Sequence, residues 1–390
     1  MELGRLRARH IVVGWLISRL ALVVLVGLTG YLIGFDRDQR RADPWAWWAG
    51  RFSWADSFHY LRIADKGYLP PGLPCCDQAF FPGYPLAIRF LTPLLGGRPT
   101  LAGLLISHVA AAVAAVLLWR LAVRLTGDAR VGVLAVLLLA VTPYGVFLSA
   151  VFTEALFLAL SLGAWLAGVE RRWWWAGMLA GLATVVRVNG VFLAAGLALM
   201  YLLQLRPAGT AGWDGGWRRP RVDALALLSP AIAVGGFVAY LHARTGSWTA
   251  WTDAQVIGWG RRTAWPWQGI QGGWHAIGHA TTPDLFVAYV ADVGFALAGV
   301  GLVLVLLWRR RWAETVYVAA SVAVLLCSTT VQSSPRYALT WFPAYLMLAE
   351  GLVWLRDRRP GIWPSVVVIG LSLPVMGAIA IALAAHLWVA

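Results

Sequence analysis

The segment Trp54-Ala55-Asp56-Ser57-Phe58-His59-Tyr60 places a carboxylate among aromatic residues, directly after the first long apolar stretch of the chain. An ionised carboxylate can accept a proton from an attacking hydroxyl, and burial against aromatic rings raises its pKa toward the working range. One alternative is purely local. Ser53 and Asp56 have the spacing of a capping box, in which the acid would only stabilise the start of its own helix.

Three further polar clusters interrupt the apolar sequence. They are Thr153-Glu154, Arg187-Val188-Asn189-Gly190 and Gln332-Ser333-Ser334-Pro335-Arg336-Tyr337. An acid such as Glu154 in the first turn of an apolar segment usually faces a cavity or a partner, although a helix N-terminus also favours its charge. Arg187 and Arg336 stand near the ends of apolar segments, where each could instead extend to lipid headgroups. His59 alone would be a routine interfacial histidine.

The whole chain is far more apolar than a soluble protein of 390 residues. Hydrophobic residues make up 60% of it and charged residues 13%, and its mean hydropathy is +0.69. The apolar residues come in runs of about 20, which is the length that a membrane-spanning helix needs. The net charge of +14 is nearly all arginine spread over many short loops, which argues against nucleic-acid binding. The sequence therefore predicts an all-α, polytopic transmembrane protein.

Eleven membrane spans are predicted, in a single domain over residues 1–390. Their limits are 13–34, 100–122, 131–149, 152–169, 173–187, 190–205, 222–243, 286–308, 313–330, 337–355 and 363–388. The short segments 173–187 and 190–205 could instead form one re-entrant pair. Arginines are concentrated in the short loops on the side of the N-terminus, so the positive-inside rule makes that side cytoplasmic and puts the C-terminus outside.

The four polar clusters and two long loops, 35–99 and 244–285, then fall on the extracytoplasmic side. In the first loop, Trp54, Phe58 and Leu61 form the apolar stripe of a juxtamembrane helix that Gly67 can end. Prolines favour a second surface or re-entrant helix over residues 82–95. The polar clusters are thus expected to converge at the outer leaflet.

This ordered set of motifs resembles the PIG-V type of mannosyltransferase, in the GT-C superfamily of membrane glycosyltransferases. The segments that carry the resemblance, over roughly residues 50–345, are Trp54 to Tyr60, Gly67-Tyr68, Phe80-Phe81-Pro82-Gly83-Tyr84-Pro85, Phe152-Thr153-Glu154, Arg187 to Gly190 and Pro335-Arg336-Tyr337. One departure is Ala55, because the family tends to place tryptophan directly before the acid.

The resemblance implies a GT-C-like fold and an inverting enzyme that takes mannose from a polyprenyl-phosphate-mannose donor. The acceptor would be a glycolipid, a glycan or a protein on the extracytoplasmic side. Asp56 is the implied catalytic residue. The implied substrate-binding residues are Glu154, Arg187, Asn189, Arg336, Tyr337, His59 and Tyr60. The sequence shows no metal-ligand cluster, so we expect no metal and no cofactor, and Arg187 or Arg336 would stabilise the leaving phosphate.

Two alternatives stay open. A GT-C enzyme could transfer another polyprenyl-phosphate sugar, such as a pentose or aminoarabinose. A transporter or lipid flippase would also place acids and arginines within the membrane, but the chain shows neither an internal repeat nor a matching pair of broken spans. The near-exclusive use of arginine, with Lys66 as the single lysine, favours a bacterial plasma membrane over the endoplasmic reticulum.

Overall fold

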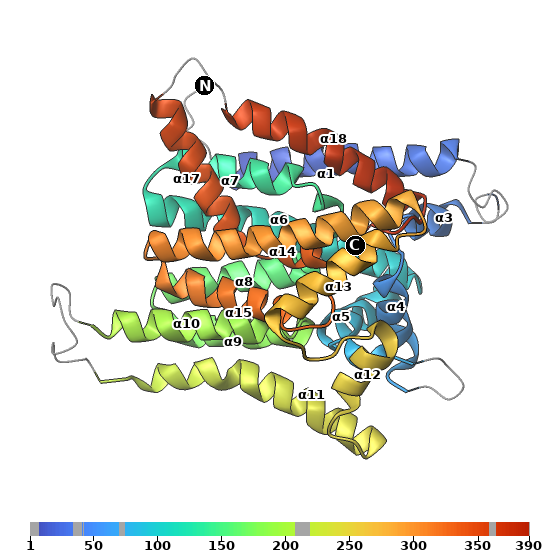
Figure 1. Ribbon diagram of the computed structural model, residues 1–390, viewed down its shortest axis with the longest axis horizontal. Helices are drawn as coiled ribbons and strands as arrows, with labels where there is room; N and C mark the ends of the chain where they lie inside the picture. Colours follow the sequence, from blue (N-terminus) through green and yellow to red (C-terminus); the bar gives the residue numbers. More distant parts are fainter. Residues whose placement is uncertain are drawn as a thin grey trace.

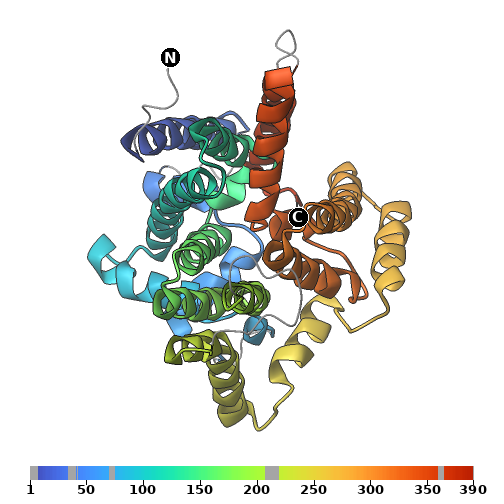
Figure 2. The ribbon, with the colours of Figure 1, turned by 90° about the vertical axis from the view of Figure 1, so that its left-hand side faces the viewer.

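A computed structural model describes residues 8–33, 41, 43–69, 75–206, 219–358 and 364–389. Across these ranges the chain forms seventeen α-helices and no β-strand, with one isolated bridge between Thr263 and Ser328. Most long helices run side by side along the horizontal of Figure 1, and Figure 2 views them end-on. The all-α prediction is therefore confirmed. Parts of the first loop, residues 34–40, 42 and 70–74, lie outside the described residues.

Each predicted apolar segment corresponds to a helix. These helices are α1 (Ala8–Leu32), α6 (Pro99–Thr126), α7 (Ala129–Val141), α8 (Glu154–Val169), α9 (Trp173–Val186), α10 (Gly190–Gln204), α11 (Ser229–Thr245) with the preceding 3-10 helix η5 (Val222–Leu228), α14 (Pro283–Trp308), α15 (Trp312–Leu326), α17 (Phe342–Arg358) and α18 (Pro364–Ala384). Five segments are long and apolar enough to cross a membrane, namely Arg9–Leu32, Pro99–Thr126, Val222–Thr245, Pro283–Trp308 and Pro364–Ala384. The count of eleven spans stays a prediction.

Short helices from the two long loops gather at the right-hand end of the molecule in Figure 1, which we call the loop end. They are α3 (Pro44–Gly50), α4 (Asp56–Lys66), α5 (Gly83–Leu91), α12 (Ala250–Trp259) and α13 (Pro266–Gly278). Gly67, with φ +74°, ends α4 as expected, and the helix expected over 82–95 is α5 followed by the 3-10 turn η3 (Thr92–Leu95). Two further short elements are η2 (Asp77–Ala79) and α16 (Ser334–Ala338).

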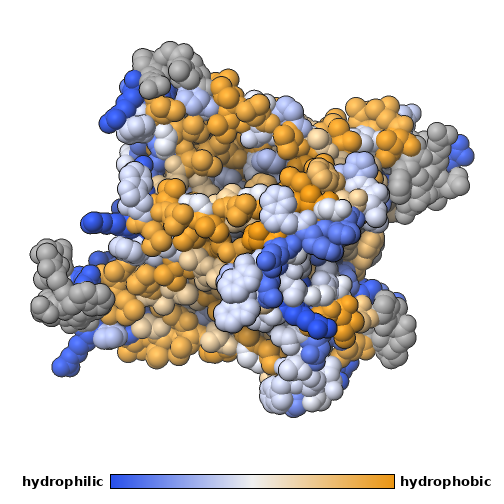
Figure 3. Space-filling view, in the orientation of Figure 1, coloured by the Kyte–Doolittle hydropathy of each residue, from blue (hydrophilic) through white to orange (hydrophobic). Residues whose placement is uncertain are grey.

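The sides of the helix bundle are apolar. Figure 3 shows hydrophobic residues over the long helices, while hydrophilic residues gather at the left edge and over the short helices on the right. Exposed apolar side chains include Ile17, Phe90 and Val367, each more than half exposed. A broad apolar surface bounded by polar ends suits contact with lipid chains. The described part of the chain thus has the surface of an integral membrane protein.

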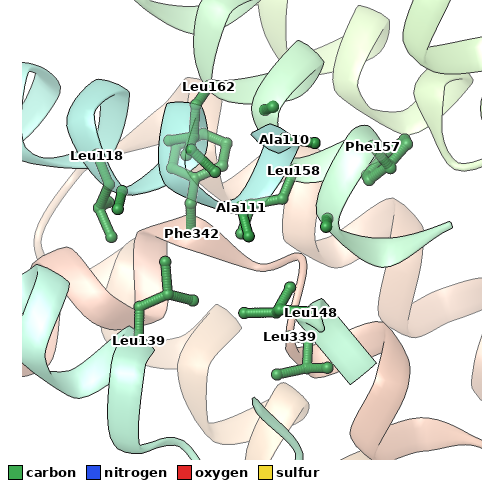
Figure 4. Packing of buried hydrophobic residues seen from close by; sticks show 14 of the residues in the cluster. Ala110, Ala111, Leu118, Leu139, Leu148, Phe157, Leu158, Leu162, Leu339 and Phe342 are labelled. Carbon is green, nitrogen blue, oxygen red and sulfur yellow. The ribbon is translucent and has the colours of Figure 1, made fainter. Parts of the chain in front are cut away.

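Inside the bundle, small residues let neighbouring helices approach closely. Ala110 and Ala111 of α6 belong to one buried cluster with Leu158 of α8, Leu139 of α7 and Phe342 of α17 (Figure 4). Alanine in place of a larger side chain brings helix backbones together, which favours packing within a membrane. This packing gives α8, whose first residue is Glu154, a rigid support.

Helix α7 ends after Val141, and the backbone of residues 142–153 continues without an α-helix until α8 begins. Arg19 of α1 satisfies carbonyl groups at this break. Its Nη1 donates to the Gly145 carbonyl at 3.0 Å and its Nη2 donates to the Ala140 carbonyl. Arg19 is only 2% exposed. Because a buried backbone carbonyl in an apolar layer needs a partner within the protein, Arg19 stabilises the irregular segment that leads to Glu154.

Candidate active site

Two acids and two arginines from four separate parts of the chain form one chain of ion pairs at the loop end. Arg187 Nη1 lies 2.6 Å from Glu154 Oε1, and Arg336 Nε lies 2.8 Å from the same oxygen. Arg336 Nη1 also lies 2.7 Å from Asp56 Oδ2. We call Asp56, Glu154, Arg187 and Arg336 the charged quartet. The structure thus brings together residues from all four of the polar clusters identified in the sequence.

The quartet is largely enclosed. The Glu154 side chain is fully buried and that of Arg336 is 6% exposed, while those of Arg187 and Asp56 are 13% and 21% exposed. Burial of single charges is costly, so the two acids and two arginines stabilise each other in this site. Both arginines point into the protein and contact Glu154. The alternative that they extend to lipid headgroups is therefore wrong. The four formal charges sum to zero.

Asp56 begins α4, but its carboxylate does not cap that helix. The N-cap residue is Ala55, with φ +51°, and no side chain caps the helix, so the capping-box alternative is wrong. The first turn is held from outside α4, since Ser57 Oγ donates to the Val151 carbonyl at 3.0 Å. Ala55 adopts a backbone conformation that favours glycine, and such strained residues often occur at functional sites.

The surroundings keep Asp56 ionised. Burial alone would raise the pKa of Asp56, but the charge of Arg336 and its hydrogen bond outweigh burial and lower that pKa below its ordinary value. The rise in pKa expected from the aromatic neighbours in the sequence is therefore wrong. Arg336 occupies only Oδ2. In the described residues no protein group donates a hydrogen bond to Oδ1, so this oxygen is not engaged by the protein.

Residues from the two long loops and from α16 line a cavity of about 110 Å³ beside the quartet. Of the predicted site residues, those that line it are Asp56, Tyr60, Arg187, Asn189, Arg336 and Tyr337. Glu154 lies behind Arg187 and Arg336 and holds both. Larger apolar cavities, of about 740 and 480 Å³, lie between the long helices away from these acids.

The remaining predicted residues surround this cavity in different ways. The Arg187 guanidinium lies over the Tyr337 ring, with the Arg187 Cζ 5.4 Å from the ring centroid. Asn189 is 3% exposed and is the N-cap residue of α10. The Tyr60 hydroxyl lies 3.5 Å from Thr153 Oγ1. Hydroxyl and amide groups in these positions can hydrogen-bond a sugar, so their predicted role in substrate binding remains a prediction that the geometry permits.

His59 does not line the cavity that contains Asp56. It belongs to a polar cluster that no sequence motif indicated. Its Nδ1 lies 2.7 Å from Asp77 Oδ1, and Arg62 Nε donates to Asp77 Oδ2 at 2.8 Å. Burial acts to raise the pKa of Asp77, but the hydrogen bonds from His59 and Arg62 lower it below the ordinary value. The bond to Asp77 orients the His59 ring, which stacks on Phe80 at 4.5 Å. Asp77 stood in no motif, so the sequence held no signal for it.

The second long loop also contributes residues that were not predicted individually. Trp251 and Gln255 of α12, and Arg261 just after it, line the same cavity as Asp56. The described residues contain no group of three or more His, Cys, Asp or Glu that could hold a metal ion. That the protein needs no metal stays a prediction.

Residues 77–211 match a protein family described as dolichyl-phosphate-mannose-protein mannosyltransferase. The matched part includes Asp77, Glu154, Arg187 and Asn189. Among solved structures, an oligosaccharyltransferase of Archaeoglobus fulgidus has a TM-score of 0.44 and 15% sequence identity, over 95% of this chain and 53% of that chain. The archaeal oligosaccharyltransferase AglB of the same organism, in complex with an inhibitory peptide and a dolichol-phosphate, has a TM-score of 0.40 and 14% identity, over 93% of this chain and 55% of that chain.

Curated proteins give closer sequence matches. GPI alpha-1,6-mannosyltransferase 2 of Cricetulus griseus is 38% identical over 152 residues, which is 36% of this chain and 30% of that protein. The Homo sapiens protein of the same name is 37% identical over 152 residues, with the same shares. GPI mannosyltransferase 2 of Chaetomium globosum is 32% identical over 219 residues, 47% of this chain and 44% of that protein. The chain thus spans less than half the length of these relatives, and the predicted resemblance to PIG-V-type mannosyltransferases is confirmed.

Proposed function

We propose that this protein is an inverting mannosyltransferase that moves mannose from a polyprenyl-phosphate-mannose donor to an acceptor hydroxyl. The family match and the names of the curated relatives support mannosyl transfer. The observation that carries the proposal is the carboxylate of Asp56, which is ion-paired to Arg336 through Oδ2 and belongs to a residue that lines the cavity. We propose that this cavity faces the extracytoplasmic side, because the loop arginines Arg171 and Arg172 lie at the opposite ends of α8 and α9 from Glu154 and Arg187.

The reaction needs one proton acceptor and one means of stabilising the leaving group. As the acceptor oxygen attacks C1 of the mannose, Asp56 Oδ1 takes the hydroxyl proton and the bond between C1 and the donor phosphate oxygen breaks. Attack from the face opposite the phosphate inverts C1. The phosphate leaves with an additional negative charge, which nearby guanidinium groups stabilise. Within the quartet, Glu154 orients Arg187 and Arg336.

The direct test is turnover by the purified full chain in detergent with defined lipid-linked sugars. We expect a mannosylated product from polyprenyl-phosphate-mannose, with release of the polyprenyl phosphate. Donors that carry a pentose or aminoarabinose test the alternative sugars in parallel. A protein that moves the donor across a vesicle membrane without forming a product would be a transporter, and the proposal would be wrong.

Arg336→Lys is expected to move the acidic limb of the pH profile of kcat/KM to higher pH. Catalysis needs ionised Asp56, so the rate falls only as the pH drops through the pKa of Asp56, which Arg336 holds low. A single ammonium cannot reproduce the two contacts that Arg336 makes to Glu154 and Asp56, so the pKa of Asp56 rises in the variant. The control is Arg244→Lys on the exposed end of α11. Superimposable pH profiles for Arg336→Lys and the wild type would show that Arg336 does not set the pKa of the catalytic carboxylate.

Transfer is expected to continue in the presence of EDTA. Arginine is the group available to the leaving phosphate, and the described residues show no cluster of metal ligands. The measurement is the initial rate before and after chelation, with Mg²⁺ and Mn²⁺ added back separately. A rate that is lost with EDTA and restored by either cation would contradict a mechanism that depends on arginine alone.

A further inference from the structure

The charged quartet has little capacity to hold an additional anion. Arg187 and Arg336 both contact Glu154, and Arg336 also contacts Asp56, so two positive charges already face two negative charges. A donor phosphate bound between these arginines would compete with the carboxylates that hold them. The group that binds the phosphate is therefore best sought among the other cations around the cavity.

Arg261 is such a cation. Its side chain makes one hydrogen bond to a backbone group, from Nη2 to the Gln332 carbonyl at 2.9 Å, and its Nε is buried without a partner. No carboxylate of the described residues lies within ion-pair distance of it. Asp292, another buried acid in this region, accepts a hydrogen bond from the Ser334 N–H instead. The Arg261 side chain also hydrogen-bonds the Tyr337 side chain, so what the protein leaves without a partner is the buried Nε donor of a cation that forms no ion pair among the described residues.

The backbone holds Arg261 in place. Gly260, with φ +64°, ends α12 and turns the chain just before it, a conformation that glycine adopts without strain. The next residue, Arg262, then pairs with Thr329 through backbone hydrogen bonding, since the Thr329 N–H donates to the Arg262 carbonyl at 3.0 Å. A donor group on a fixed backbone loses less conformational freedom when it binds an anion.

Arg261 also lies where three cavities meet. It lines the cavity of about 110 Å³ that contains Asp56, a smaller one of about 70 Å³ and a third of about 370 Å³. The third cavity extends past Leu325 to Val324 of α15, which is half exposed on the apolar side of the bundle. A ligand with a sugar, a phosphate and an apolar chain would thus find a separate space for each part.

We propose that Arg261 binds the phosphate of a polyprenyl monophosphate, with the sugar in the Asp56 cavity and the lipid chain leaving past Val324. This inference rests on the proposed function for the sugar that the lipid carries. The phosphate site itself does not depend on which sugar is transferred. Arg187 and Arg336 then act mainly on Asp56, Glu154 and the sugar.

The test is equilibrium binding of undecaprenyl monophosphate and of uncharged undecaprenol to the purified full chain. Binding is measured through the change in tryptophan fluorescence. Arg261→Gln is expected to weaken binding of the phosphate by about 10-fold to 100-fold, because a charge-assisted hydrogen bond is lost. Binding of undecaprenol should not change. Arg261→Lys retains the charge and should bind with intermediate affinity, and Arg244→Gln, an exposed arginine on α11, should bind like the wild type.

Two results separate this inference from the proposed function. If Arg261→Gln binds undecaprenyl monophosphate as tightly as the wild type, or transfers mannose with an unchanged KM for the donor, the phosphate site is wrong while the transferase remains. If the wild type transfers no mannose but Arg261→Gln still loses affinity for the phosphate, the phosphate site stands and the proposed function fails. If Arg261→Gln does not fold, equal affinities of Arg261→Lys and the wild type would likewise overturn the inference.

Discussion

Asp56→Asn is expected to reduce mannose transfer by about 100-fold or more, because the variant keeps the shape of the side chain and loses the proton acceptor. The loss should appear in kcat, with little change in the KM for the donor. Initial rates of the purified variant with polyprenyl-phosphate-mannose measure both. Asp65→Asn is the matched control, since Asp65 lies near the other end of α4 and is exposed.

A variant Asp56→Asn that turns over at nearly the wild-type rate would show that Asp56 is not the base. The structure then offers His59 as the nearest alternative on the same helix, oriented by Asp77. In that case Asp77→Asn would cause the large loss of kcat instead. Measuring both variants with the same donor preparation distinguishes the two assignments.

Glu154→Gln is expected to destabilise the fold and to reduce activity together. Glu154 is fully buried and accepts hydrogen bonds from both Arg187 and Arg336, so its neutral replacement leaves two positive charges close together. Removal of one partner of a buried ion pair costs roughly 3–5 kcal/mol. Thermal unfolding of the purified protein, with Glu170→Gln at the other end of α8 as control, measures the loss. Equal melting temperatures for the two variants would contradict a stabilising role for Glu154.

The positions of the helices followed from the sequence because they depend on local chemistry. Backbone groups in an apolar layer must bond within their own segment, so each long apolar run forms a helix. Similarly, the stripe from Trp54 to Leu61 and the terminating Gly67 predicted α4, and the prolines around Gly83 predicted α5. The apolar run predicted over 131–149 failed in part, since α7 ends at Val141. The carbonyls of that break are bonded by Arg19 of α1, a contact between distant residues that no local pattern reveals.

Sequence alone also indicated which residues matter at the site, since acids and arginines are rare and costly in apolar segments. It identified Asp56, Glu154, Arg187 and Arg336 and predicted that their clusters converge on one side of the membrane, but it left open whether each side chain acts locally or pairs with the others. Only the tertiary structure decided that Arg336 contacts both acids, one of them 280 residues away. The same holds for Asp77 and Arg261, whose roles arise from neighbours on other elements. Charge pairing depends on distance in space, and chain order does not encode that distance.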